Sequence, residues 1–201
     1  REHDGACFSV IKTLAGCLAL QLLVLEQIRE LADLVRIDPL TKTFNRRHFD
    51  ETMRGIWQCW VDERIPFALV AVDIDHFKAI NDTYGHHTGD AVLKAVAQRL
   101  NTSIGKDDAV VRMGGEEFAL ILARREADDA KAIANAAHDA LRSTPFQIAD
   151  MSLTVTASFG VAVAADGDDC PMAVYRRADR ALYAAKSSGR DRVRFGALPS
   201  E

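Results

Sequence analysis

Two carboxylates stand where an apolar run in the first half of the chain ends. Asp73 and Asp75, on either side of Ile74, directly follow the run at residues 67–72. Mg²⁺ prefers oxygen ligands of this kind and leaves coordination positions for substrate phosphates. The segment could therefore hold a divalent cation, but a helix cap at Asp75 and a solvated Asp73 would account for the same residues.

A second acidic pair lies at the tip of a predicted hairpin, in Gly114-Gly115-Glu116-Glu117. Glycine lets a polyphosphate approach the backbone closely, whereas an isolated acidic tip is also typical of a solvated hairpin. Carboxylates at two adjoining strand ends are an arrangement used in two-metal phosphoryl transfer. The combination with Asp73 therefore favours phosphoryl chemistry.

Asn81 and Asp90 flank a polar segment, residues 84–89, that contains His86 and His87. The donor and acceptor of asparagine and the two acceptors of aspartate match the edge of guanine. A turn at Asn81 and a helix N-cap at Asp90 explain the spacing equally well. Adjacent histidines cannot easily face one ion, so we expect His86 and His87 to be polar loop residues.

Lys186 and Arg190 surround Gly189 at the predicted end of the last helix. The helix dipole alone would explain either cation. The chain has a formal net charge of -4 and a pI near 5.9, so a triphosphate would have to be met by local cations. This acidic balance also predicts no nucleic-acid partner.

Composition suits one globular domain with an appendage, because 48% of the 201 residues are hydrophobic and 27% are charged. The cysteines are far apart and form no Cys-x-x-Cys pair, which predicts neither a zinc site nor disulfides and fits the reducing cytoplasm. The start reads poorly as a signal peptide. We expect a cytoplasmic output region of a longer protein.

Apolar residues recur at steps of three and four from Ile11 to Val35, the pattern of a coiled-coil seam. This favours a dimerising helix over a membrane segment, because Lys12 and Gln21 interrupt the apolar run. The last helix of an upstream sensor domain is a third reading. Pro39 ends the helix, so we divide the chain into a helical region at 1–37 and a globular domain at 38–198, with no membrane segment.

The elements of the globular domain follow from periodicity and from breakers. We expect helices at 45–63, 76–83, 90–104, 126–142 and 172–187, and strands at 67–73, 110–113, 118–122, 153–164 and 192–195. The order predicts an α/β (α+β) fold with a palm-like mixed central sheet surrounded by helices. No Gly-x-Gly-x-x-Gly or P-loop motif is present, which argues against the common nucleotide-binding folds.

The motifs together resemble those of the GGDEF-type diguanylate cyclases, and they keep that family's order over residues 38–195. The blocks that carry the resemblance are Asp38-Pro39-Leu40-Thr41, Asn45-Arg46-Arg47, Asp73-Ile74-Asp75-His76-Phe77-Lys78, Asn81-Asp82-Thr83-Tyr84-Gly85-His86, Gly89-Asp90, Arg112-Met113-Gly114-Gly115-Glu116-Glu117-Phe118, Ser158-Phe159-Gly160-Val161, and the segment from Ala178-Asp179 to Arg190. The signature carries Glu at its third position, which preserves the carboxylate.

The resemblance implies the following roles. Asp73, Ile74 and Glu116 would hold Mg²⁺ or Mn²⁺, and Asp73, Glu116 and Glu117 would be the catalytic residues. The GTP-binding residues would be Asn81, Asp90, Lys186, Arg190, Gly114, Gly115, Phe77 and Lys78.

The activity implied is the condensation of two GTP molecules into cyclic di-GMP, by a homodimer that the N-terminal helix brings together. A catalytically inactive module that senses GTP or cyclic di-GMP, and a cyclase with another nucleotide product, are the alternatives.

Many members of this family also carry an inhibitory Arg-x-x-Asp site for the product. Here the aspartate is Asp108, but Gly105 stands in place of the arginine. Glycine lacks the planar fork that grips guanine or phosphate. We therefore expect only weak product inhibition through this site.

Overall fold

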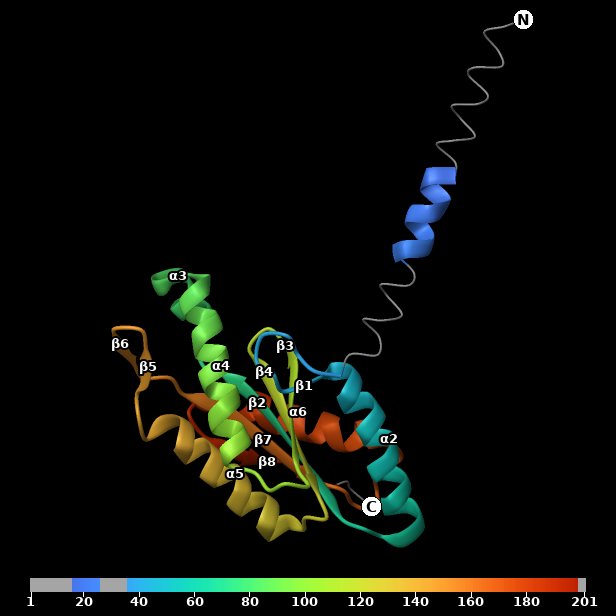
Figure 1. Ribbon diagram of the computed structural model, residues 1–201. Coiled ribbons are helices and arrows are strands. Elements are labelled where there is room, and N and C mark those ends of the chain that lie inside the picture. Colours follow the sequence, from blue (N-terminus) through green and yellow to red (C-terminus); the bar gives the residue numbers. More distant parts are fainter. Residues whose placement is uncertain (1–15, 26–35, 199–201) are drawn as a thin grey trace, which may run out of the picture. The chain divides into compact units, whose positions relative to one another are not determined.

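The computed structural model describes residues 16–25 and 36–198 (Figure 1). The chain separates into two compact units, Arg1–Arg36 and Ile37–Glu201. In the first unit, residues 16–25 are helical and their side chains are exposed. The remaining positions of the predicted seam, at 11–15 and 26–35, lie outside the described residues, so the dimerising helix stays a prediction. None of the described helices is both long and apolar enough to cross a membrane.

The second unit is built on a six-stranded mixed sheet in the order β1-β3-β4-β2-β7-β8. The strands are β1 (Phe44–Asn45), β2 (Phe67–Ile74), β3 (Ala109–Gly114), β4 (Glu117–Ala123), β7 (Ala157–Val163) and β8 (Val193–Phe195). The central strand β2 is antiparallel to both β4 and β7, whereas β1 with β3 and β7 with β8 are parallel pairs. The mixed sheet confirms the predicted fold class.

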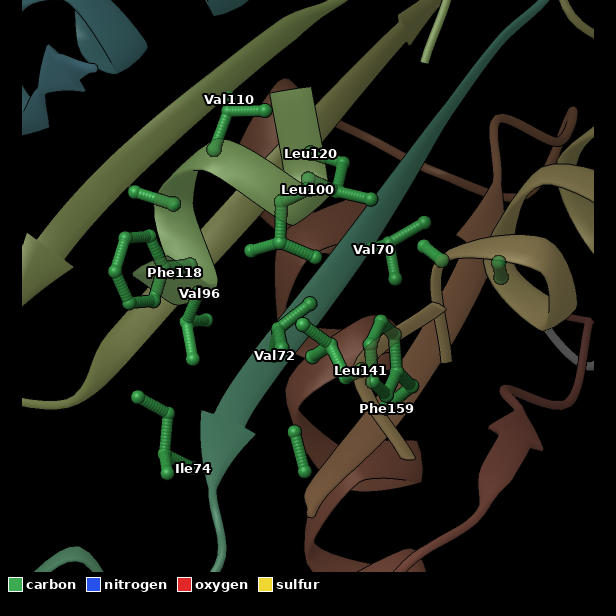
Figure 2. Close-up of a cluster of buried hydrophobic side chains, with 14 of the residues drawn as sticks. Val70, Val72, Ile74, Val96, Leu100, Val110, Phe118, Leu120, Leu141 and Phe159 are labelled. Carbon is green, nitrogen blue, oxygen red and sulfur yellow. The ribbon is translucent and has the colours of Figure 1, made fainter. Parts of the chain in front are cut away.

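Helices cover both faces of this sheet (Figure 1). The bounds are α2 (Arg46–Glu63), α3 (Phe77–Tyr84), α4 (His86–Thr102), α5 (Ala127–Arg142) and α6 (Pro171–Ser187). Side chains of α4 and α5 pack with one face of the sheet, and those of α2 and α6 pack with the other. Figure 2 shows the first of these two cores, in which β2, β4, β7 and the two helices interlock.

The strand β2 is buried along its whole length because it contributes to both cores. Val70, Val72 and Ile74 point into the α4 and α5 core, while Leu69 and Ala71 point into the α2 and α6 core. Because successive side chains of a strand point to opposite faces, residue 73 lies on the same face as Leu69 and Ala71, which is the face that α6 covers. A continuous apolar run is what a strand between two helical layers requires.

Most predicted elements are confirmed, with small shifts at their ends. Asn45 caps α2 by accepting a hydrogen bond from the His48 backbone N–H at 3.2 Å. Gly114 and Gly115 have φ angles of 153° and 48°, which confirms that the hairpin turn needs glycine. The 126–142 helix begins one residue later than expected, after Glu126.

Two local predictions were wrong. The strand expected at 153–164 is divided, because β6 (Met151–Leu153) pairs with β5 (Phe146–Ile148) in a separate small hairpin. The β-branched residues at 154–156 have strand propensity throughout, so the pattern does not reveal the break. The loop expected at 84–89 is also absent, because α4 begins at His86 after a break at Gly85 alone.

Candidate active site

Asp73 lies at the end of β2 on the face that α6 covers. Its carboxylate forms an ion pair with the Lys186 ammonium, with Nζ 2.7 Å from Oδ2. The Asp73 side chain is only 8% exposed, and that of Lys186 is 33% exposed. Burial raises the pKa of Asp73 above its ordinary value; Lys186 opposes this rise, and Glu116 and Glu117 add to it. The end of the strand is therefore an unfavourable position for a negative charge.

The turn between β3 and β4 brings the second acidic pair to the same end of the sheet. Glu117 is the register partner of Asp73, and the Ile74 backbone N–H donates to the Glu116 carbonyl at 3.3 Å. Gly114 and Gly115, which precede the pair, are exposed. The predicted convergence of the two strand ends therefore follows from the pairing of β2 with β4.

Asp75, the other carboxylate of the first motif, is occupied elsewhere. It is 5% exposed and accepts hydrogen bonds from the Ser158 hydroxyl at 2.7 Å and from the Thr156 hydroxyl at 2.9 Å. The N-cap of α3 is His76, so Asp75 is not the helix cap of the simpler reading. Only Asp73 of the two is available to a ligand.

The donors at this end of the sheet suit a hard cation. Asp73 and Glu116 offer carboxylate oxygens, and Ile74 can offer only a backbone carbonyl. Within the described part of the chain, no three His, Cys, Asp or Glu side chains gather as a complete metal site. An incomplete oxygen set is typical of Mg²⁺ sites, in which water and substrate phosphates supply the remaining ligands.

Asn81 and Asp90 are brought to one corner by the sharp turn from α3 to α4. Gly85, with φ 84°, separates the two helices, and its N–H donates to the Asn81 carbonyl at 2.9 Å. The Asn81 side chain lies against Gly89, where an added Cβ would come within 1.9 Å of Oδ1. Asp90 is exposed inside α4, so the N-cap reading of this residue is wrong.

Phe77 and Lys78 form the first turn of α3, where backbone N–H groups have no acceptor within the helix. Phe77 is buried in the core of α4 and α5, whereas Lys78 is exposed. Arg190 is also exposed, just beyond the end of α6, and its N–H donates to the Ala185 carbonyl at 3.0 Å. Three cations therefore lie on these segments: Lys78 in the first turn of α3, Lys186 in the last turn of α6, and Arg190 just beyond α6.

Arg112 makes two contacts near the site that its place in the sequence did not predict. Its guanidinium donates to the Gly115 carbonyl at 2.8 Å through Nη2 and to the Asp38 carboxylate at 3.2 Å through Nη1. Burial alone would raise the pKa of Asp38, but hydrogen bonds from Thr41 and Arg112 hold it below its ordinary value. In the sequence, the only indication of this contact is that Asp38 and Arg112 both lie in segments that carry the family resemblance.

Asp108 has a structural role in the turn before β3. Its fully buried carboxylate accepts from the Gly105 N–H at 3.0 Å, the Ala123 N–H at 3.1 Å and the Arg125 guanidinium at 3.3 Å. A Cβ at Gly105 would lie 2.8 Å from Nη2 of Arg125. The arginine beside Gly105 is therefore Arg125, which lies two residues beyond the end of β4 and is paired with Asp108.

Comparison with known proteins gives a consistent family. The family model for the diguanylate cyclase GGDEF domain matches residues 35–192. YhcK of Bacillus subtilis is 42% identical over 160 residues, which are 79% of this chain and 45% of YhcK. The probable diguanylate cyclase DgcT of Escherichia coli is 35% identical over 85% of this chain and 38% of DgcT. The chain thus spans less than half the length of these relatives.

Solved structures agree with the sequence comparison. The coiled coil and GGDEF domain of DgcB from Caulobacter crescentus, in complex with c-di-GMP, superimposes with a TM-score of 0.77 and 30% identity. The match covers 94% of this chain and all of the DgcB chain. On the family match and the shared fold, the chain belongs to the GGDEF-domain family of diguanylate cyclases.

Proposed function

We propose that this chain is an active diguanylate cyclase, which condenses two GTP molecules into cyclic di-GMP and releases pyrophosphate, as the output region of a signalling protein. The observation that carries the proposal is the meeting of Asp73, the Glu116-Glu117 turn and Lys186 at one end of the sheet. Carboxylates beside a cation are what a reaction between a hydroxyl group and a triphosphate requires.

The nucleotide would be bound at two places. Asn81 and Asp90 would hydrogen-bond the guanine edge at the corner of α3 and α4. Lys186, Arg190 and the first turn of α3 at Phe77 and Lys78 would hold the terminal phosphates, since cations and unpaired N–H groups both stabilise anions. The exposed Gly114 and Gly115 leave the backbone open beside the phosphate chain.

Asp73, the Ile74 carbonyl and Glu116 would hold Mg²⁺ or Mn²⁺. A divalent cation at this place would act as a Lewis acid on the phosphate oxygens. It would also relieve the cost of a buried carboxylate whose pKa is raised. Lys186 would then turn from Asp73 to a phosphate oxygen.

Glu116 would accept the proton from the attacking 3′-hydroxyl, with Glu117 next to it in the sequence. The 3′-oxygen forms a bond to the α-phosphorus of the other nucleotide, and the bond to pyrophosphate breaks. Each domain would bind one GTP, so two domains must face each other. The predicted N-terminal helix would bring them together, and the coiled coil in the DgcB structure supports this arrangement.

The test is to incubate the 201-residue chain with GTP, with ATP and with both, in the presence of Mg²⁺, and to analyse the products. We expect cyclic di-GMP and pyrophosphate from GTP and no adenine-containing product. Binding of GTP without turnover would instead support the sensing module. An adenine-containing cyclic product would show that the chain is another nucleotidyl cyclase.

Replacing Glu116 by glutamine should preserve the fold and abolish turnover, because the amide has almost the same shape but cannot accept the proton. Cyclic di-GMP formation is measured beside the thermal unfolding of the same sample. Synthesis near the unmodified level would contradict the assignment of Glu116.

A further inference from the structure

Arg190 and Asp191 form an unusual backbone segment between α6 and β8. Their φ angles are 58° and 44°, so two consecutive residues with side chains occupy the left-handed region. This region is unfavourable for residues with side chains, and such a conformation persists only where its surroundings enforce it. The segment directly carries the guanidinium that we assign to the terminal phosphates.

Hydrogen bonds hold both residues in this conformation. The Asp191 N–H donates to the Asp75 carboxylate at 3.0 Å. The Asp191 carboxylate in turn contacts Nε2 of His138 on α5 at 2.9 Å and Nη2 of Arg142 at 3.6 Å. The Arg190 carbonyl accepts from the Arg192 side chain at 2.8 Å.

Both anchors of Asp191 are fixed in the body of the domain. Asp75 is 5% exposed and is held by the hydroxyls of Thr156 and Ser158. His138 is 7% exposed and packs edge-on against Phe159, with ring centroids 5.6 Å apart. Asp75 and His138 therefore act as rigid supports, and the loop at 190–191 is fastened to them.

We propose that Asp75, Asp191 and His138 are positioning residues, which hold the backbone at 190–191 so that Arg190 faces the terminal phosphates of the nucleotide. The inference rests on the proposed role of Arg190 in binding GTP. It gives Asp75 a task different from that of Asp73: one carboxylate of the motif serves the cation, and the other fixes a phosphate-binding loop.

The proposal predicts a loss of nucleotide affinity that depends on whether the nucleotide carries terminal phosphates. Without the His138 contact, an alanine at position 191 would relax toward negative φ and carry the Arg190 side chain away. Affinity for a guanosine triphosphate should fall, while affinity for a monophosphate, which lacks the terminal phosphates, should not. An overall weakening of the fold would affect both ligands.

The experiment measures the affinity of the full chain for 3′-deoxy-GTP, which cannot react, and for 3′-deoxy-GMP. Asp191→Ala should lower affinity for the triphosphate roughly tenfold and change affinity for the monophosphate by less than about twofold. Asp191→Asn should retain most of the affinity, because asparagine tolerates the left-handed region and keeps an acceptor for His138. Asp191→Ala and Arg190→Ala should not be additive in the double variant.

The outcomes distinguish the positioning role of Asp191 from the phosphate-binding role of Arg190. Loss of triphosphate affinity in Arg190→Ala but not in Asp191→Ala overturns the positioning role alone. No loss in Arg190→Ala overturns the phosphate role assigned under the proposed function. Equal loss for both ligands, or an additive double variant, shows a general structural effect and also overturns the inference. If Asp191→Ala does not fold, His138→Leu asks the same question with residue 191 unchanged.

Discussion

Asp73 is nearly buried, and under the proposed function it must also be charged to bind a cation, so these two properties oppose each other. Its raised pKa means that the native state keeps a proton at pH values where the unfolded chain has lost it. The free energy of unfolding therefore falls as the pH rises from 3.8 through the folded pKa. The ionised residue therefore lowers stability at neutral pH.

Replacing Asp73 by asparagine should raise the free energy of unfolding at neutral pH by roughly 0.5–2 kcal/mol and abolish activity. The gain should shrink as the pH falls toward 3.8, because the unmodified carboxyl is then protonated. Thermal unfolding of both proteins at acidic and neutral pH, without divalent cations, measures this. A variant that is less stable at neutral pH would show that the Lys186 ion pair outweighs burial.

Gly89 is predicted to act through its neighbour Asn81. A methyl group at position 89 would overlap Oδ1 of Asn81, which lies 1.9 Å from the ideal Cβ position. Because the obstructing atom ends a flexible side chain, Gly89→Ala should fold and displace the amide. We expect the KM for GTP to rise by an amount equivalent to about 1–3 kcal/mol, as for Asn81→Ala.

The control for this measurement is Gly55→Ala on α2, where an added Cβ meets nothing within 4 Å. Its KM should not change. If Asn81→Ala raises the KM and Gly89→Ala does not, the contact between these two residues has no part in guanine binding.

The positions of candidate site residues could be predicted from the sequence only where residue types and spacing were distinctive. Asp73 was identified because it ends an apolar run, and the Gly114-Gly115 turn because glycine was required. The tasks of Asp75 and His138 could not be predicted, because their partners are distant in sequence: Asp191 is 116 residues from Asp75 and 53 from His138.

At the scale of elements, the close approach of α6 to β7 determines where Lys186 lies. Gly160 on β7 leaves room for the helix backbone, since an added Cβ would be 2.1 Å from the Ala178 carbonyl oxygen and 2.2 Å from the Leu182 nitrogen. Neither atom belongs to a flexible side chain, so the helix itself would have to move.

Gly160→Ala should therefore lower the free energy of unfolding by about 1–3 kcal/mol, the usual cost of overpacking. It should also raise the KM for GTP, because α6 carries Lys186. Gly55→Ala again serves as the control, and there we expect a gain of roughly 0.5–1 kcal/mol from helix propensity. A stable Gly160→Ala enzyme with unchanged KM would mean that the helix position tolerates more than the contact distances suggest.

Element types were predictable wherever periodicity was strong, as in β2 and α5. The errors fell where short-range patterns compete. The β-branched residues at 154–156 lie between β6 and β7 without belonging to either strand. A single glycine, Gly85, rather than a loop, separates α3 from α4. Sequence pattern indicates which segments are apolar, but the partner of each strand is decided by packing of the whole sheet.

For the whole molecule, the proposed reaction would require two nucleotide-loaded domains, and the N-terminal helix is the predicted means of pairing them. A chain that begins at Ile37 retains the second compact unit and lacks the first. It should be more monomeric, and its specific activity should fall more steeply on dilution. Sedimentation velocity and activity over a concentration series measure both effects. Equal dimerisation with and without residues 1–36 would count against the helix.

The Arg112 guanidinium has a thermodynamic consequence, because one rigid planar group is shared by Asp38 at the start of the domain and by the Gly115 carbonyl in the catalytic turn. Its two contacts cannot be optimised independently. If a bound nucleotide favours one arrangement of the turn and that arrangement favours one position of Asp38, the coupling free energy between the two is the same in both directions. Under the proposed function, GTP binding at the turn and a displacement of Asp38 would therefore influence each other through Arg112.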